Sequence, residues 1–326
     1  MIDLDGSVIA RAVGAVLGSA TGDALGAGYE FSDPAPDEEI VMKGGGPFPH
    51  HQWAPGEWTD DTQMAVAILD VMATGSRDLD AIASNFLAWH AAGPPDEGIQ
   101  TTEVLGGADH AEDLSAVAVA YFDKHGRAGN GGLMRTAPVA LAALEDRAEI
   151  ARLAGSIASL THPDPDSVAA CTLWSLAIQE AITTAEPDQA FDWEAAVRNG
   201  FQHVSEDRRE RWDELVTKAV TGPPGLFNPN GWVVTAFQAA LSAIVSTPIP
   251  VEQPSDHLRD ALVAAVRIGN DTDTVAAIAG ALLGARWGTG AIPEEWLALV
   301  HGDRRRGSEQ IRANDLEQLA RNAVLA

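Results

Sequence analysis

The sequence has a single cysteine, Cys171, among its 326 residues. One thiol cannot form an intramolecular disulfide, and a zinc site built from several thiolates is excluded. This cysteine usage suits a reducing compartment, so we expect a cytoplasmic protein.

Basic residues are also scarce. The chain has 21 Lys and Arg against 47 Asp and Glu, which gives a formal net charge of −26. Such a field repels nucleic acid and anionic lipid and attracts cations, so DNA, RNA and membrane surfaces are poor partners. An anionic ligand needs bound cations or backbone amides that invert the local field.

Targeting signals and long apolar runs are missing as well. The residues up to Gly6 lack the basic start and long apolar core of a secretory signal. The longest apolar stretch that we identify, near Val275 to Ala285, is shorter than the ~20 residues that a bilayer span requires. We therefore expect a soluble protein without a membrane-spanning segment.

Alternating strand patterns are absent, and helical periodicity dominates. Apolar residues make up 46% of the chain and charged residues 21%, which is ordinary globular usage. Glycine- and proline-rich segments punctuate the helical stretches, without a long linker or an internal repeat. The sequence thus predicts one compact all-α domain over residues 1–326. Its clearest helical stretches run from Val8 to Leu25, Met64 to Met72, Leu79 to Trp89, Val168 to Ile178, Val233 to Ile244 and Leu258 to Ile268.

Two clusters of aspartate and threonine each precede an apolar helical run. Thr59-Asp60-Asp61-Thr62 stands before Met64, and Asn270-Asp271-Thr272-Asp273-Thr274 stands before Val275. A helix N-cap needs only one side-chain oxygen, so both clusters hold more oxygens than capping uses. Independent caps remain the alternative interpretation.

Brought together, the two clusters offer four carboxylates. Adjacent carboxylates repel each other unless a cation neutralises them. Mg²⁺ and Mn²⁺ prefer oxygen ligands, which carboxylates, threonine hydroxyls and water supply, so the pattern indicates a two-metal site. A calcium loop of the EF-hand type does not fit, because Val275 and Ala276 occupy positions that need an oxygen ligand and a glycine.

A glycine-rich segment, residues 129–135, reads Gly-Asn-Gly-Gly-Leu-Met-Arg. Its glycines let the backbone approach a ligand and present amides to an anion, and Arg135 would add a cation nearby. The segment matches neither the Walker nor the Rossmann pattern, and a plain turn is the alternative.

In their order along the chain, these motifs resemble the ADP-ribosylglycohydrolase family, which includes the dinitrogenase reductase-activating glycohydrolases. The resemblance starts at Gly18 to Gly26, continues through Trp58 to Thr62, Gly129 to Arg135 and Thr161-His162, and ends at Asn270 to Thr274. It spans a motif-bearing core of about residues 8–287.

The resemblance implies a compact orthogonal array of helices with two Mg²⁺ or Mn²⁺ ions in a cleft. It implies hydrolysis of the glycosidic bond between ADP-ribose and an acceptor, namely a modified protein side chain or a small ADP-ribosyl conjugate. By position, the implied metal ligands are Thr59, Asp60, Asp61, Asp271, Asp273 and Thr274.

The same resemblance assigns roles to other positions. Asp96 resembles the acidic residue near the scissile bond, although its neighbour Glu97 replaces a more usual aliphatic residue. Glu30 resembles a mobile glutamate over the metals and is a second candidate acid or base. We count Asp61 with these catalytic residues. The implied diphosphate and ribose contacts are Asn130, Gly131, Gly132, Leu133 and His162.

Two other functions remain open from the sequence. A binding module could recognise ADP-ribose without cleaving it, and a nucleotide phosphohydrolase also uses two metals. The sequence reveals neither the acceptor, because surrounding loops select it, nor the oligomeric state.

Overall fold

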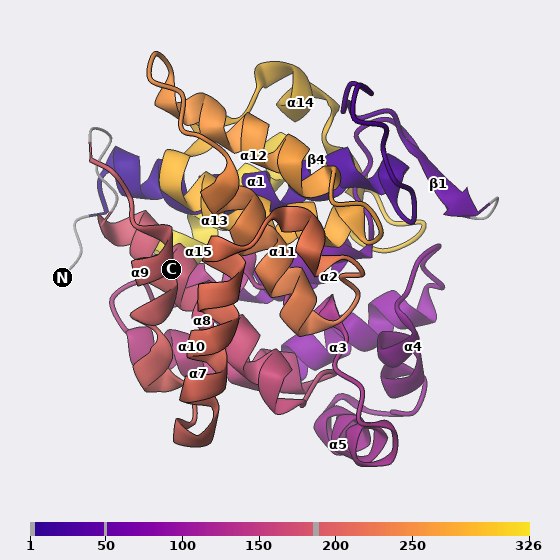
Figure 1. The fold of residues 1–326 in the computed structure, drawn as a ribbon. Helices are drawn as coiled ribbons and strands as arrows, with labels where there is room; N and C mark the ends of the chain where they lie inside the picture. The colour runs from indigo at the N-terminus through magenta and orange to yellow at the C-terminus, as the bar shows by residue number, and fades with distance from the viewer. Residues whose placement is uncertain (1–3, 49–50, 185–188) are drawn as a thin grey trace.

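The computed structural model describes residues 4–48, 51–184 and 189–326. Within these ranges fifteen α-helices and two short antiparallel hairpins form the fold (Figure 1). The helices of the first half are α1 (Gly6–Gly26), α2 (Asp60–Met72), α3 (Leu79–Ala91), α4 (Ile99–Leu105), α5 (Leu114–His125), α6 (Ala137–Leu141) and α7 (Arg147–Ser159). Those of the second half are α8 (Pro165–Thr184), α9 (Trp193–Arg198), α10 (Glu206–Thr221), α11 (Val233–Ser246), α12 (His257–Val266), α13 (Thr272–Trp287), α14 (Glu294–Leu299) and α15 (Ala313–Leu325).

The strands are short. They are β1 (Gly45–Phe48) paired with β2 (His51–Trp53), and β3 (His301–Asp303) paired with β4 (Gln310–Arg312). Short 3₁₀ turns cover Ala27–Tyr29, Ala111–Asp113, Asn130–Gly132, Phe201–His203, Pro224–Phe227, Pro254–Asp256 and Thr289–Ala291. Strands of three or four residues carry too little alternation to be recognised in a sequence, so these hairpins add to the predicted all-α fold without changing its class.

Helices α1 and α13 pass each other in direct backbone contact at the centre of the molecule (Figure 1). A Cβ atom on Gly18 would lie 2.3 Å from the carbonyl oxygen of Gly280, and one on Gly22 would lie 2.1 Å from that of Ala276. Only glycine allows so close an approach. The contact extends to Gly26, whose carbonyl accepts a hydrogen bond from the Thr272 hydroxyl at 2.8 Å. The end of α1 is therefore fixed against the start of α13.

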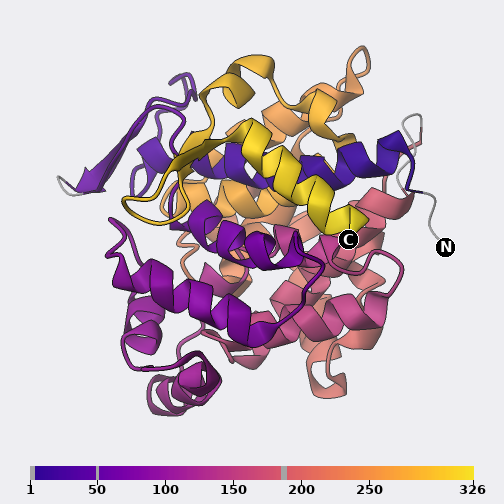
Figure 2. The ribbon, with the colours of Figure 1, turned by 180° about the vertical axis from the view of Figure 1, so that it is seen from behind.

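The other helices surround this pair. Helices α8, α11 and α12 pack on α13, while α2, α6 and α15 pack on α1. Figure 2 shows α15, in yellow, lying along α1 on the back of the molecule. One continuous hydrophobic cluster extends from Val8 to Ala323. All six predicted helical stretches are helices here, except that α12 ends two residues before Ile268.

One sequence-based expectation about apolar stretches is wrong. The segment Gly6–Tyr29 is long and apolar enough to cross a bilayer, with a mean hydropathy of 1.3 in its most apolar window. In the described part of the chain, 83% of that window is buried by other helices. Packing at the centre of the fold accounts for this composition, because a helix surrounded by other helices is apolar all round. The length and apolar composition of this segment are therefore weak evidence for a membrane span.

Candidate active site

The N-terminus of α2 is capped from another helix. Asp23 on α1 is fully buried and accepts hydrogen bonds from the Thr59 and Thr62 amides, both at 2.9 Å, and from the Thr62 hydroxyl at 2.5 Å. Burial raises the pKa of Asp23 to about 6, and the hydrogen bonds from Thr62 and Thr59 oppose this. Thr59 is itself the N-cap residue, and its hydroxyl accepts from the Asp61 amide at 3.4 Å, so Asp23 adds a second set of capping contacts from α1.

Asp61 joins the two acidic clusters. Its Oδ2 atom accepts hydrogen bonds from the Thr59 hydroxyl at 3.4 Å and from the Thr274 hydroxyl at 3.3 Å. The side chain is buried, and its Oδ1 atom has no hydrogen-bond partner. The starts of α2 and α13 therefore meet at Asp61, so the two sequence clusters lie together in space.

The second cluster also holds the glycine-rich segment. Asp271 Oδ2 accepts a hydrogen bond from Asn130 Nδ2 at 2.6 Å, and the Asp271 amide donates to Asn230 Oδ1 at 2.9 Å. Asp273 is buried and accepts from the Thr274 amide at 2.9 Å. Asn230 was not among the sequence candidates, although the turn-forming stretch 228–231 around it is a recognisable loop signal.

The clustered carboxylates destabilise each other's ionised forms. Burial raises the pKa values of Asp60, Asp61 and Asp273 well above their usual range, and neighbouring carboxylates raise them further. The strongest neighbouring charge is Asp96 for Asp60 and Glu30 for Asp273. A bound cation would favour the ionised forms of these carboxyl groups.

Glu30 follows the end of α1 and is only 8% exposed, with a buried Oε2 atom that has no hydrogen-bond partner. Burial, followed by the charges of Asp96 and Asp271, raises the pKa of Glu30 to about 9. The next residue, Phe31, has a φ angle of +51°, and its amide donates to the Asn270 carbonyl at 2.6 Å. This contact ties the Glu30 backbone to the start of the second cluster.

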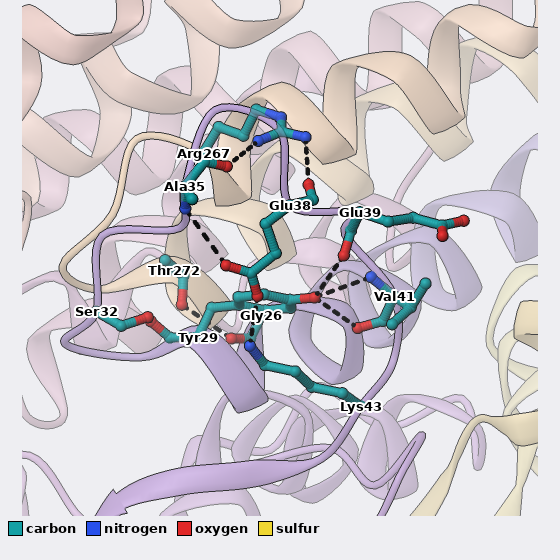
Figure 3. A network of polar contacts seen from close by, with 10 residues as sticks. All are labelled: Gly26, Tyr29, Ser32, Ala35, Glu38, Glu39, Val41, Lys43, Arg267 and Thr272. Carbon is teal, nitrogen blue, oxygen red and sulfur yellow. Dashed lines mark hydrogen bonds and ion pairs between the residues drawn. The ribbon is translucent and has the colours of Figure 1, made fainter.

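The loop after Glu30 is held in place by the network shown in Figure 3. The Tyr29 ring is buried, and its hydroxyl accepts a hydrogen bond from the Val41 amide at 3.0 Å. Arg267, which follows α12, donates to two carbonyls of the loop, including that of Glu38 at 2.7 Å. The backbone that carries Glu30 is thereby anchored against the end of α12.

These residues surround a cavity of about 490 Å³. The sequence candidates that line it are Glu30, Asp60, Asp61, Asp96, Asn130, Gly131, His162, Asp271, Asp273 and Thr274. Thr59, Gly132 and Leu133 lie behind this lining. Glu97 is not part of the lining and its carboxylate lies 2.8 Å from His90 Nδ1, so the unusual residue beside Asp96 contacts α3.

Two expectations about the glycine-rich segment need correction. Leu133 is fully buried in the core, and its amide donates to the Asn130 carbonyl at 2.8 Å, so its side chain does not face the cavity. Arg135 is also fully buried and lies over the Phe86 ring at 4.4 Å, so it supplies no cation to a ligand there. An arginine that can stack on a core aromatic ring looks the same in sequence as one that faces a ligand.

Arg135 instead supports His162. It donates to the Thr161 hydroxyl at 2.6 Å, and that hydroxyl lies 2.8 Å from His162 Nδ1. The other edge of the ring faces the glycine-rich segment, because a Cβ on Gly131 would lie 3.1 Å from His162 Cε1. Burial and the nearby arginine lower the pKa of His162 to about 3, so the ring is a neutral hydrogen-bonding group.

Sequence reasoning missed several cavity residues. Arg127 is the only lysine or arginine among the described residues of the lining, and it has no hydrogen-bond or ion-pair partner within the described chain. Gln100 accepts from the Gly129 amide at 3.1 Å and donates to the Thr161 carbonyl at 3.0 Å. The exposed side chain of Trp232 lines the rim. A lone exposed arginine has no sequence signature.

The fold and this cavity define a class of all-helical proteins with an acidic, buried centre. The family model for ADP-ribosylglycohydrolase matches residues 5–326. The chain therefore belongs to the ADP-ribosylglycohydrolase family, whose enzymes hydrolyse ADP-ribosyl bonds.

Characterised relatives agree with this assignment. The chain is 30% identical over 301 residues to the ADP-ribosyl-[dinitrogen reductase] glycohydrolase of Rhodospirillum rubrum, covering 90% of each chain. It is 27% identical to the ADP-ribosylarginine hydrolase Tri1 of Serratia proteamaculans, over 90% of this chain and 76% of that one. A solved structure titled ADP-ribosylglycohydrolase-related protein complex superimposes with a TM-score of 0.74 at 27% identity, covering 98% of both chains.

Proposed function

We propose that this enzyme hydrolyses the glycosidic bond between ADP-ribose and an acceptor with the help of two Mg²⁺ or Mn²⁺ ions. The observation that carries the proposal is the meeting of two buried acidic clusters, at the starts of α2 and α13, inside one cavity. The proposed ligands are Thr59, Asp60, Asp61, Asp271, Asp273 and Thr274.

The donor set fits hard divalent cations. It consists of carboxylate and hydroxyl oxygens, and the Asp61 Oδ1 atom is buried without a partner. Among the residues that the structure describes, no group of three or more His, Cys, Asp or Glu side chains lies close enough together to hold a metal ion without rearrangement. The Thr274 hydroxyl, a further oxygen donor, lies 3.3 Å from Asp61 Oδ2. Bound cations would remove the mutual repulsion that raises these pKa values.

Bound cations would supply orientation of the ribose hydroxyls and a lowered pKa of coordinated water. Asp96 lines the same cavity and is proposed to accept the proton of the attacking water. Glu30, as the second acid or base, would exchange a proton with the acceptor. The carboxylates around the anomeric carbon would stabilise the positive charge that develops there.

The far side of the cavity suits the nucleotide half of the substrate. Asn130 and Gly131 line it, and the neutral His162 ring lies behind them with its polar edge toward the glycine-rich segment. Gly132 and Leu133 lie behind this lining and are assigned no ligand contact. Arg127 supplies the positive charge that an anionic diphosphate needs in so acidic a protein.

A modified protein side chain is the proposed acceptor, in line with the names of the relatives that act on ADP-ribosylarginine and on dinitrogen reductase. A small ADP-ribosyl conjugate is the alternative, and we place the reaction in the cytoplasm. The experiment incubates the protein with Mn²⁺ or Mg²⁺ and a panel of arginine-, serine- and acidic-residue-linked ADP-ribose substrates, and detects products by mass spectrometry.

The products separate the candidate functions. Free ADP-ribose supports the proposal, and the preferred substrate identifies the acceptor. Tight binding without release would indicate a binding module. AMP with ribose-5-phosphate would indicate a phosphohydrolase.

A further inference from the structure

The β3–β4 hairpin lies beyond the motif-bearing core, yet it contacts the segment that leads into α2. The amide of Trp58 donates to the His301 carbonyl and the amide of His301 donates to the Gly56 carbonyl, both at 3.0 Å. Trp58 is fully buried and directly precedes Thr59. The hairpin is thus bonded to the backbone immediately before the first acidic cluster.

The Trp58 side chain fits closely against the hairpin. Its indole nitrogen donates to the Asp303 carbonyl at 3.3 Å. A Cβ on Gly302 would lie only 2.3 Å from that nitrogen, so the indole lies directly on the strand backbone. Further along α2, Asp70 pairs with Arg304 at 3.2 Å. The hairpin therefore holds α2 at two points.

The same hairpin contacts the loop that carries Asp96. Arg306 Nη1 donates to the Gly93 carbonyl at 2.9 Å, and Gly93 has a φ angle of +66°. Only two residues, Pro94 and Pro95, separate Gly93 from Asp96. Each proline ring fixes its φ angle and removes a backbone donor, so this connection is stiff. A hold on the Gly93 carbonyl consequently limits where Asp96 can lie.

We propose that the β3–β4 hairpin is a clamp that fixes Asp96 relative to the acidic start of α2, and that Arg306 is the positioning residue through which it acts. In Figure 2 the yellow loop of the hairpin lies beside the purple segments that it would hold. Arg306 does not line the cavity. The inference rests on the proposed function, because it assumes that Asp96 takes part in the reaction.

The turn of the hairpin is itself well ordered for this role. The Asp303 carboxylate accepts from the Gly307 amide at 3.1 Å, and the Ser308 amide donates to the Arg305 carbonyl at 2.9 Å. The guanidinium of Arg305 makes no hydrogen bond or ion pair with the described residues. Arg305 is therefore a matched control for Arg306, because it is the same residue type in the same turn.

The first experiment compares the steady-state kinetics of Arg306→Ala, Arg306→Lys and Arg305→Ala. Loss of one charge-assisted hydrogen bond should lower the kcat of Arg306→Ala about 3- to 10-fold. The KM and the metal concentration at half activity should stay within about twofold of the values for the unaltered enzyme, since the proposed substrate and metal contacts are unchanged. Arg306→Lys should recover part of kcat, and Arg305→Ala should match the unaltered enzyme. Equal kcat values for both alanine variants would overturn the inference.

A double-mutant cycle tests whether Arg306 acts through Asp96. In an Asp96→Asn background, Arg306→Ala should cause no further loss of kcat, because the group that it positions is already disabled. If Arg306→Ala lowered kcat by the same factor with Asp96 and with Asn at position 96, this would contradict the clamp.

Hydrogen exchange gives a readout without catalysis. Amides of residues 96–99 should exchange several-fold faster in Arg306→Ala and not in Arg305→Ala. Unchanged exchange at these amides in Arg306→Ala would overturn the clamp, whether or not the unaltered enzyme is active. If the unaltered enzyme shows no turnover, that result alone counts only against the proposed function.

Discussion

Replacing Glu30 by glutamine should stabilise the metal-free protein at neutral pH. Burial beside other carboxylates raises the pKa of Glu30 from 4.5 to about 9, so at pH 7.5 the folded protein keeps this group protonated. In the unfolded chain the same group is ionised. Glutamine has nearly the shape of the protonated acid and does not need this proton.

The size and sign of the effect follow from linkage. Between pH 4.5 and about 9 the folded state binds the proton more tightly than the unfolded state, so the free energy of unfolding falls as pH rises. Three pH units above the unfolded value, at about 1.36 kcal/mol each, give about 4 kcal/mol at pH 7.5. Some hydration of the cavity reduces this, so we expect a gain of about 2–4 kcal/mol, or roughly 3–6 °C in Tm for a chain of this length.

The assay is thermal and urea unfolding of the unaltered protein and Glu30→Gln in EDTA, at several values between pH 4.5 and 8.5. The stability difference should be near zero at pH 4.5 and grow with pH. Glu38→Gln is the control, because the hydrogen bond from Lys43 lowers the pKa of Glu38 and its neutralisation brings no gain. The reasoning would be refuted if the stability difference between Glu30→Gln and the unaltered protein were no larger at pH 7.5 than at pH 4.5.

Two further predictions concern packing and substrate binding. Gly18→Ala should lower the free energy of unfolding by about 3 kcal/mol, measured by urea unfolding, because its Cβ meets the Gly280 carbonyl. Gly6→Ala on the same helix meets nothing within 4 Å and should cost nothing. Arg127→Gln should raise the KM about 10-fold in steady-state kinetics with kcat unchanged, because it removes the charge proposed to face the diphosphate. Lys124 lies outside the cavity lining, so Lys124→Gln should leave both constants unaltered. An equal effect of both members of either pair would contradict the corresponding argument.

The helices and acidic clusters were predictable because their signals are local. Thr59 caps α2 as its place before an apolar run indicates. The two clusters lie together at one cavity, and their role as metal ligands stays a prediction. The capping of α2 by Asp23 was not predictable, because Asp23 and Thr59 are 36 positions apart and the contact depends on how α1 crosses the fold.

Other parts of the site depend on tertiary packing. Glycines spaced four residues apart occur in many helices, so their spacing alone does not indicate a close contact. Only the position of α13 shows that Gly18 and Gly22 are needed for the two backbones to meet. Arg135 was expected near the ligand but is buried over Phe86, whereas Arg127, which was not a candidate, lines the cavity. The β3–β4 hairpin escaped notice because three-residue strands carry no periodic signal.

The most direct test of the whole account is the release of ADP-ribose by the unaltered enzyme and by Asp61→Asn, each titrated with Mn²⁺. Asp61 links the two acidic clusters, so its amide variant should remain folded but lose at least about 10³-fold in turnover at every metal concentration. The unaltered enzyme should release ADP-ribose only when metal is present. Release of ADP-ribose in excess EDTA, or undiminished release by Asp61→Asn, would contradict the proposed metal-assisted mechanism.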